Sequence, residues 1–82
     1  MIKVLHIKPE KDYRLFVKLS NGRSGYFDVS PYLDKGIFKE LRDPNYFKLA
    51  RLGFGGVTWP HRQDFSADTI DYELQVLQER VA

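Results

Sequence analysis

The sequence predicts a two-layer α+β domain, in which a C-terminal helix packs on one face of an antiparallel sheet of about five strands. Three observations lead to this fold class. Polar and apolar residues alternate from Tyr13 to Leu19, as in a half-buried strand. Turn-forming residues separate the short apolar runs that follow. Near the C-terminus, four apolar residues recur at the spacing of an amphipathic helix: Ile70, Leu74, Leu77 and Val81.

Length and composition fit one domain, residues 1–82, whose core must come from side-chain packing. There is no cysteine, so no disulfide can stabilise it. Hydrophobic residues make up 43% and aromatic residues 15%, enough for a small core or for one completed at a dimer interface. No apolar run approaches the ~20 residues that span a bilayer, and the N-terminus has no signal-peptide pattern. We therefore expect a cytoplasmic protein without a membrane partner.

The first two strands are expected at residues 2–7 and 13–19, with a turn at Pro9-Glu10-Lys11-Asp12 between them. Residues 2–7 are apolar at nearly every position, which indicates a strand covered on both faces. A hairpin at Ser20-Asn21-Gly22 follows.

Side-chain parity decides the form of this hairpin. A two-residue Asn-Gly loop would divide the apolar residues between the two faces of the sheet. A three-residue loop pairs Leu19 with Arg23, places Leu15 opposite Phe27 and gathers one apolar face, so we predict a type I turn with Gly22 in a left-handed bulge. The apolar face then carries Leu15, Val17, Phe27 and Val29. The opposite face carries Arg14, Phe16, Lys18, Ser24, Tyr26 and Asp28.

Short helical turns are expected next. Ser30 suits an N-cap, Pro31 the first helical position and Gly36 the stop. A second turn is expected at residues 37–42, and Tyr46-Phe47 should cover the core.

A second hairpin is predicted from residues 48–52 and 56–59 around Gly53-Phe54-Gly55, with Leu49, Val57 and Trp59 as its apolar residues. Pro60 ends its last strand because proline has no N–H for a ladder. Ser66 suits the N-cap of the final helix, and the acids near its start favour the positive end of the helix dipole: Asp68, Asp71 and Glu73. This helix should lie across the apolar sheet face.

Six stretches of the chain carry a resemblance to a known family. They are Asp12-Tyr13-Arg14-Leu15, Ser20-Asn21-Gly22-Arg23, Phe27-Asp28-Val29-Ser30-Pro31-Tyr32-Leu33, Leu41-Arg42-Asp43-Pro44-Asn45-Tyr46-Phe47, and the runs Gly56-Val57-Thr58-Trp59-Pro60 and Asp64-Phe65-Ser66-Ala67-Asp68-Thr69-Ile70. Together they resemble the bacterial family catalogued as domain of unknown function 2442 (DUF2442). The most specific part is the Trp-Pro and the Asp-apolar-x-x-Asp-x-apolar pattern that follows it.

The resemblance implies a small antiparallel α+β fold and no established activity. It also implies an antitoxin-like role in a two-gene module, beside a small protein of another uncharacterised family. The chain departs from the family in two places. His61-Arg62 stands where the family usually has Asn-Gly, and residues 73–82 extend the last helix.

The segment after the second hairpin is one candidate partner-binding site, with Trp59, His61, Arg62 and Asp64 as its residues. The structural alternative makes Trp59 a core residue and Asp64 a helix cap. His61 and Arg62 have no expected place in the core and are either solvated or bound to a partner.

A catalytic site is not expected. His61 would need Ser66 as a nucleophile or Asp64 as an orienting group, and nothing marks Ser66 as more than an N-cap. A metal site from His6, His61 and Asp64 is a weaker hypothesis still. We expect neither enzyme activity nor a cofactor.

The polar sheet face is the other candidate site, because Phe16 and Tyr26 lie between Arg14 and Lys18 there. Exposed aromatic residues gather at protein interfaces, and they also stack on bases in sheet-based RNA binders. The net charge is only +2, so we rank a protein partner above nucleic acid. That partner is a neighbour-encoded protein or a second copy of the chain.

Overall fold

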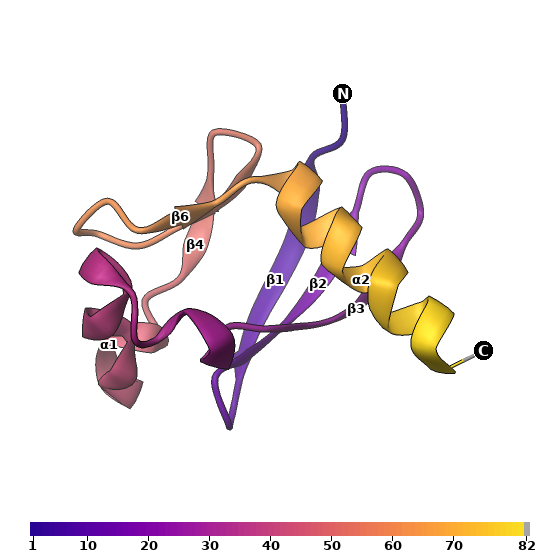
Figure 1. Ribbon diagram of the computed structural model, residues 1–82. Helices are drawn as coiled ribbons and strands as arrows, with labels where there is room; N and C mark the ends of the chain where they lie inside the picture. The colour runs from indigo at the N-terminus through magenta and orange to yellow at the C-terminus, as the bar shows by residue number, and fades with distance from the viewer. Residues whose placement is uncertain (82) are drawn as a thin grey trace.

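The computed structural model describes residues 1–81, and their side chains through residue 77. It has an α+β fold, as predicted, with six strands in two antiparallel sheets rather than about five strands in one (Figure 1). The elements in chain order are β1 (Val4–Glu10), β2 (Arg14–Leu19), β3 (Ser24–Asp28), the 3-10 helices η1 (Ser30–Tyr32) and η2 (Gly36–Arg42), α1 (Pro44–Phe47), β4 (Arg51–Gly53), β5 (Gly56–Thr58), β6 (Asp64–Phe65) and α2 (Ala67–Val81).

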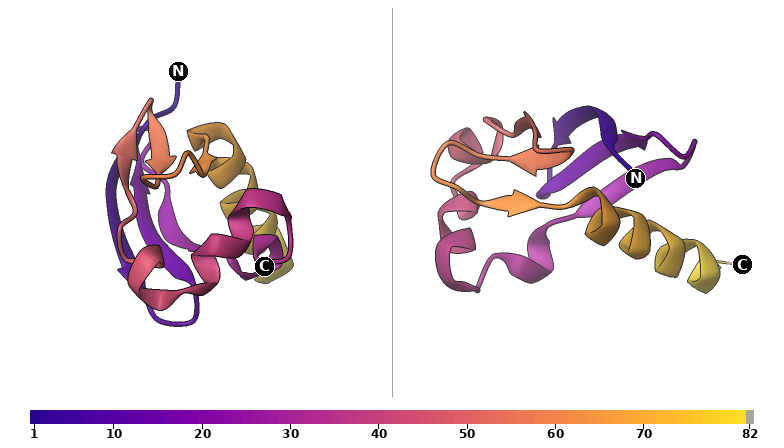
Figure 2. Two further views of the ribbon diagram at one scale, coloured as in Figure 1. Left: turned by 90° about the vertical axis from the view of Figure 1, so that its left-hand side faces the viewer. Right: turned by 90° about the horizontal axis from the view of Figure 1, so that it is seen from above.

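The two sheets enclose a common core together with the short helices. The first sheet has the order β1-β2-β3 and the second the order β4-β5-β6. They meet where the Val4 N–H donates to the Gly55 carbonyl over 2.8 Å. The second sheet and the short helices gather at one side of the first sheet, and α2 runs beside β3 (Figure 2). The buried apolar side chains are Val4, Leu15, Val17, Leu19, Phe27, Val29, Leu41, Tyr46, Phe47, Val57, Trp59, Phe65, Ala67, Ile70 and Leu74.

The β2–β3 hairpin has the predicted register. The Leu19 N–H donates to the Arg23 carbonyl over 2.9 Å, and Leu15 lies opposite Phe27. Gly22 has a φ of 89°, the left-handed conformation that the bulge requires. All four residues of the predicted apolar face are buried. The predicted three-residue loop and its register are therefore confirmed.

The first strand differs from the prediction at one face and at its end. Leu5 is 59% exposed, so β1 is not covered on both sides. β1 also continues through Pro9, and the turn falls later, where Asp12 and Tyr13 have φ values of 63° and 60°. Pro9 is tolerated because Leu15, its partner, bonds to β3. Pro9 and Leu15 therefore form a pair without hydrogen bonds between them. The backbone nitrogen of Pro9 points away from β2, so its missing N–H costs no hydrogen bond of the β1–β2 ladder.

The short helices occupy the predicted positions, but their caps differ. Val29 rather than Ser30 is the N-cap of η1. The Ser30 N–H and hydroxyl both donate to Asp28 Oδ1, over 2.9 and 2.7 Å, so Ser30 closes the turn that leaves β3. Gly36, with a φ of 48°, begins η2 rather than ending the first turn.

The second hairpin is shorter than predicted and is followed by a strand that the sequence pattern did not show. Leu49 lies outside the hairpin and is exposed. The loop has two residues, Phe54 and Gly55, with φ values of 52° and 80°. Asp64 belongs to β6, which pairs with β5, so the prediction that Asp64 caps the helix is wrong. Pro60 does end the run after Trp59, as expected.

The start of α2 is as predicted. The Ser66 hydroxyl accepts the Thr69 N–H over 3.1 Å, which makes Ser66 the N-cap. Ile70 and Leu74 are buried, and Leu74 lies over Gly25 on the apolar face of the first sheet. Leu77, by contrast, is 51% exposed, so the predicted apolar stripe ends at Leu74. The side chain of Val81 lies outside the described residues.

The buried carboxylate of Asp71 ties α2 to the β2–β3 hairpin. Its Oδ1 accepts hydrogen bonds from Asn21 Nδ2 over 2.9 Å and from Arg23 Nε over 2.8 Å, and Oδ2 accepts one from Gln75. The hydrogen bond from Asn21 is the largest of the effects that lower the pKa of Asp71 below its ordinary value of 3.8. Asp71 thus has a tertiary role beyond the helix dipole.

Candidate functional site

The polar face of the first sheet, which we call the outer face, is the main candidate site. Because directly paired residues share a face, the register assigns nine side chains to it. They are His6, Lys8, Glu10, Arg14, Phe16, Lys18, Ser24, Tyr26 and Asp28. Seven of these are exposed, and Glu10 and Phe16 are half-buried. The predicted site residues Arg14, Phe16, Lys18 and Tyr26 therefore do lie together on an open surface.

Aromatic rings occupy the middle of the outer face. Phe16 and Tyr26 are direct partners on β2 and β3, and their rings meet edge to face with centroids 5.4 Å apart. His6 approaches Phe16 from β1 at 6.4 Å. The Arg14 guanidinium lies 5.2 Å from the Tyr26 ring centroid, within the range of a cation–π contact. Tyr26 is nevertheless 48% exposed, so much of its ring is available for contact.

β1 contributes three residues to this face that the sequence argument missed. His6, Lys8 and Glu10 lie opposite Lys18, Phe16 and Arg14, respectively. The irregularity between Val4 and His6 shifts the register by one residue, so a simple alternation from the start of the strand gives the wrong face. Lys8, which is exposed, and Glu10, which is half-buried, form an ion pair with a 3.8 Å separation.

Of the second candidate site, Trp59 is a core residue. It is 2% exposed, its indole N–H donates to the Phe47 carbonyl over 3.0 Å, and its ring lies 5.9 Å from that of Phe47. Its neighbours in the chain differ. His61, Arg62 and Asp64 are exposed, and Arg62 has a φ of 77° in the turn. Trp59, Arg62 and Asp64 nonetheless line one shallow cavity of about 370 Å³, which His61 does not join.

Gln63, to which the sequence assigns no role, is the centre of a buried hydrogen-bond network. It is 1% exposed. Its Oε1 accepts the Tyr46 hydroxyl over 2.7 Å, and its Nε2 donates to the Ile37 carbonyl and to Glu40 Oε1, each over 2.9 Å. The loop after Trp59 is thereby joined to η2 and α1.

His61 belongs to the same network, contrary to the expectation that it has only solvent or a partner to contact. Its N–H donates to the Tyr46 hydroxyl over 2.9 Å, its ring stacks on Tyr46, and its Nδ1 lies 2.6 Å from Glu40 Oε2. The pKa of Glu40 is lowered from its ordinary value, and the hydrogen bond from Gln63 is the largest cause. Partial burial acts in the opposite direction and raises this pKa, whereas the contact with His61 lowers it further.

This arrangement does not assemble the catalytic group considered from the sequence. His61 is oriented by Glu40, not by Asp64, and the Ser66 hydroxyl is engaged with Thr69 at the helix start. Within the described residues, no three His, Asp or Glu side chains gather as metal ligands would. Among these residues there is also no helix of the length and apolar character that a membrane span requires.

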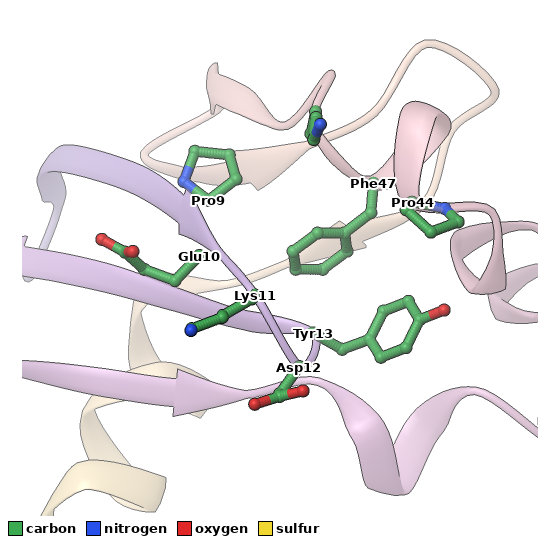
Figure 3. A pocket seen from close by; sticks show the side chains of 8 residues that line it. Pro9, Glu10, Lys11, Asp12, Tyr13, Pro44 and Phe47 are labelled. Atoms are coloured by element: carbon green, nitrogen blue, oxygen red, sulfur yellow. The ribbon is translucent and has the colours of Figure 1, made fainter.

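An open cleft of about 520 Å³ lies between the β1–β2 turn and α1 (Figure 3). Pro9, Tyr13, Pro44 and Phe47 give it apolar walls, and Lys11 and Asp12 stand at its side. The Tyr13 and Phe47 rings pack edge to face at 5.6 Å, and the Tyr13 hydroxyl donates to the Arg42 carbonyl. These contacts hold the β1–β2 turn on η2 and α1, so residues with a structural role border the cleft.

Comparison with known families settles where the chain belongs. A family model described as "Protein of unknown function (DUF2442)" matches residues 4–73. The chain belongs to the DUF2442 family. No curated protein and no solved structure matches it. The matched region contains the whole outer face and the Trp59–Asp64 segment, while α2 continues to Val81 beyond it. Membership in DUF2442 carries no activity with it, so function must be argued from the surfaces themselves.

Proposed function

We propose that this DUF2442 protein is a non-enzymatic module that binds another protein through its outer face. The observation that carries the proposal is the Phe16–Tyr26 pair at the middle of an open antiparallel sheet, in which Phe16 is half-buried and Tyr26 is exposed. Aromatic side chains surrounded by polar groups are typical of the centre of protein interfaces, where a few large rings supply most of the binding energy. The edge-to-face geometry also fixes both rings before a partner arrives, which reduces the entropy lost on binding.

The partner that we propose is a small protein encoded beside this one, which the module would neutralise in the cytoplasm as an antitoxin does. The family resemblance motivates this part of the proposal. Two features support a non-enzymatic role: His61 Nδ1 is engaged with Glu40, and the Ser66 hydroxyl caps α2. Neither group is arranged as a base beside a nucleophile.

Co-expression with the product of the adjacent gene, followed by size-exclusion chromatography, tests the proposal. We expect one peak that contains both proteins. The double variant Phe16→Ser, Tyr26→Ser should abolish the complex, while Tyr72→Ser, which changes an exposed tyrosine on α2, should preserve it. Two separate peaks for the unmodified pair would contradict the proposal.

Nucleic-acid binding is the second candidate, because Arg14 lies over Tyr26 and the open rings could stack on bases. Arg23 and the His61-Arg62 pair would supply further positive charge. This alternative predicts an affinity for single-stranded oligonucleotides that falls steeply with salt. Absence of binding at low ionic strength would remove it.

A further inference from the structure

The register of the first sheet arranges the outer face as a grid of three rows. The rows are Glu10–Arg14–Asp28, Lys8–Phe16–Tyr26 and His6–Lys18–Ser24. Phe16 is at the centre, and its four nearest positions hold Lys8, Arg14, Lys18 and Tyr26. The Phe16 ring is thus bordered by cationic side chains on three sides and by the Tyr26 ring on the fourth. The carboxylates lie only at two corners, both at the Arg14 end.

A second copy of the chain does not fit this face. A two-fold axis through Phe16 and along β2 would set Arg14 against Arg14 and Lys18 against Lys18. An axis across the strands would set Arg14 of one copy against Lys18 of the other. Each of the two diagonal axes would set Lys8 of one copy against either Arg14 or Lys18 of the other. Every symmetric arrangement centred on Phe16 therefore places like charges in direct opposition, which disfavours association.

The positions of the carboxylates also disfavour a polyanion. Glu10 and Asp28 flank Arg14 in one row, so a phosphate backbone that contacts all three cations must also approach both acids. The Lys18 row contains no acid. A single carboxylate can therefore reach Lys18 without repulsion, beside an apolar group that packs on Phe16 and Tyr26.

We propose that the outer face binds an acidic segment of a different protein, with an aromatic or long aliphatic side chain over Phe16 and Tyr26 and a carboxylate on Lys18. This inference rests on the proposed protein-binding function and specifies the chemistry of its partner. The charges steer the segment and fix its orientation, and the rings supply the apolar contact.

The test uses the isotopically labelled chain and nuclear magnetic resonance. The probe is a random copolymer of glutamate and tyrosine, compared with a copolymer of lysine and tyrosine and with oligothymidylate. We expect amide shifts at Phe16, Lys18 and Tyr26 with the acidic copolymer only. Lys18→Glu should weaken its binding by about tenfold or more. Lys39→Glu, which makes the same charge change at an exposed position of η2, should change it by less than about twofold.

Several outcomes would overturn the inference. Equal shifts with oligothymidylate would assign the face to nucleic acid, and shifts on changing the concentration of the protein alone would assign it to a second copy. No shift with the acidic copolymer would also reject it. A complex with the neighbouring gene product that tolerates Lys18→Glu would reject this inference and leave the proposed protein-binding function standing. If no such complex forms, the proposed function fails as well.

Discussion

The hydroxyl of Tyr46 donates a hydrogen bond to the buried amide oxygen of Gln63 over 2.7 Å and accepts one from the His61 N–H. Tyr46 comes from α1 and Gln63 from the loop that precedes β6, so one phenol joins two segments that are 17 residues apart. Within the described residues, no buried polar side-chain atom is left without a partner. The network is therefore complete, and the removal of one member leaves others unsatisfied.

Replacement of Tyr46 with phenylalanine should lower the free energy of unfolding by about 1–3 kcal/mol, because the Gln63 oxygen loses its donor inside the core. Urea unfolding followed by the fluorescence of Trp59, the single tryptophan, measures the loss. Tyr72→Phe removes an exposed hydroxyl and should change stability by less than about 0.5 kcal/mol. Equal effects of the two substitutions would show that the network does not stabilise the fold.

Stability should fall in acid partly through Glu40 and Asp71. The pKa of each carboxyl is lowered in the folded protein, from 4.5 and 3.8 respectively, first by the hydrogen bonds from Gln63 and Asn21. Their stabilisation is therefore fully present above these ordinary values and is lost as the pH falls through the lowered ones. Urea unfolding from about pH 7 down to pH 3 should show this decline. It should be shallower in Glu40→Gln, and an unchanged slope would contradict this assignment.

The β2–β3 hairpin could be predicted from sequence because its information is local. The alternation along β2 and the Ser20-Asn21-Gly22 loop together allow only one register that gathers the apolar residues on one face. The same local pattern identified the rows of the outer face on β2 and β3. It failed on β1, where a bulge after Val4 interrupts the alternation and no residue type marks the irregularity.

The Gln63 network could not be predicted, because nothing in its neighbourhood in the sequence distinguishes a buried glutamine from a solvated one. Its burial depends on Ile37 and Glu40, which lie more than 20 residues away. β6 was missed for a similar reason: a strand of two residues has too little periodicity to detect, and its pairing to β5 depends on the turn at Arg62.

Gly56 should be the least replaceable glycine of the second sheet. A Cβ at this position would lie 2.2 Å from the carbonyl oxygen of Phe65, a backbone atom that can move only with β6. We expect Gly56→Ala to lower the unfolding free energy by about 3 kcal/mol, at the upper end of overpacking effects. Gly25→Ala is the matched control, because its Cβ would meet the end of the Leu74 side chain at 3.2 Å, which can rotate away. A larger loss for Gly25→Ala in urea unfolding would contradict this comparison.

Phe54 offers the opposite case, in which a substitution should stabilise the protein. It is fully exposed, at 100%, and has a φ of 52° in a two-residue hairpin loop before Gly55. Phenylalanine disfavours this left-handed conformation, whereas Asn-Gly is the preferred pair for such a turn. Phe54→Asn should therefore raise the free energy of unfolding by about 0.5–1 kcal/mol. Phe54→Ala keeps the unfavourable conformation and should leave stability nearly unchanged. Stabilisation of the same size by both substitutions would show that ring exposure, rather than backbone conformation, limits this hairpin.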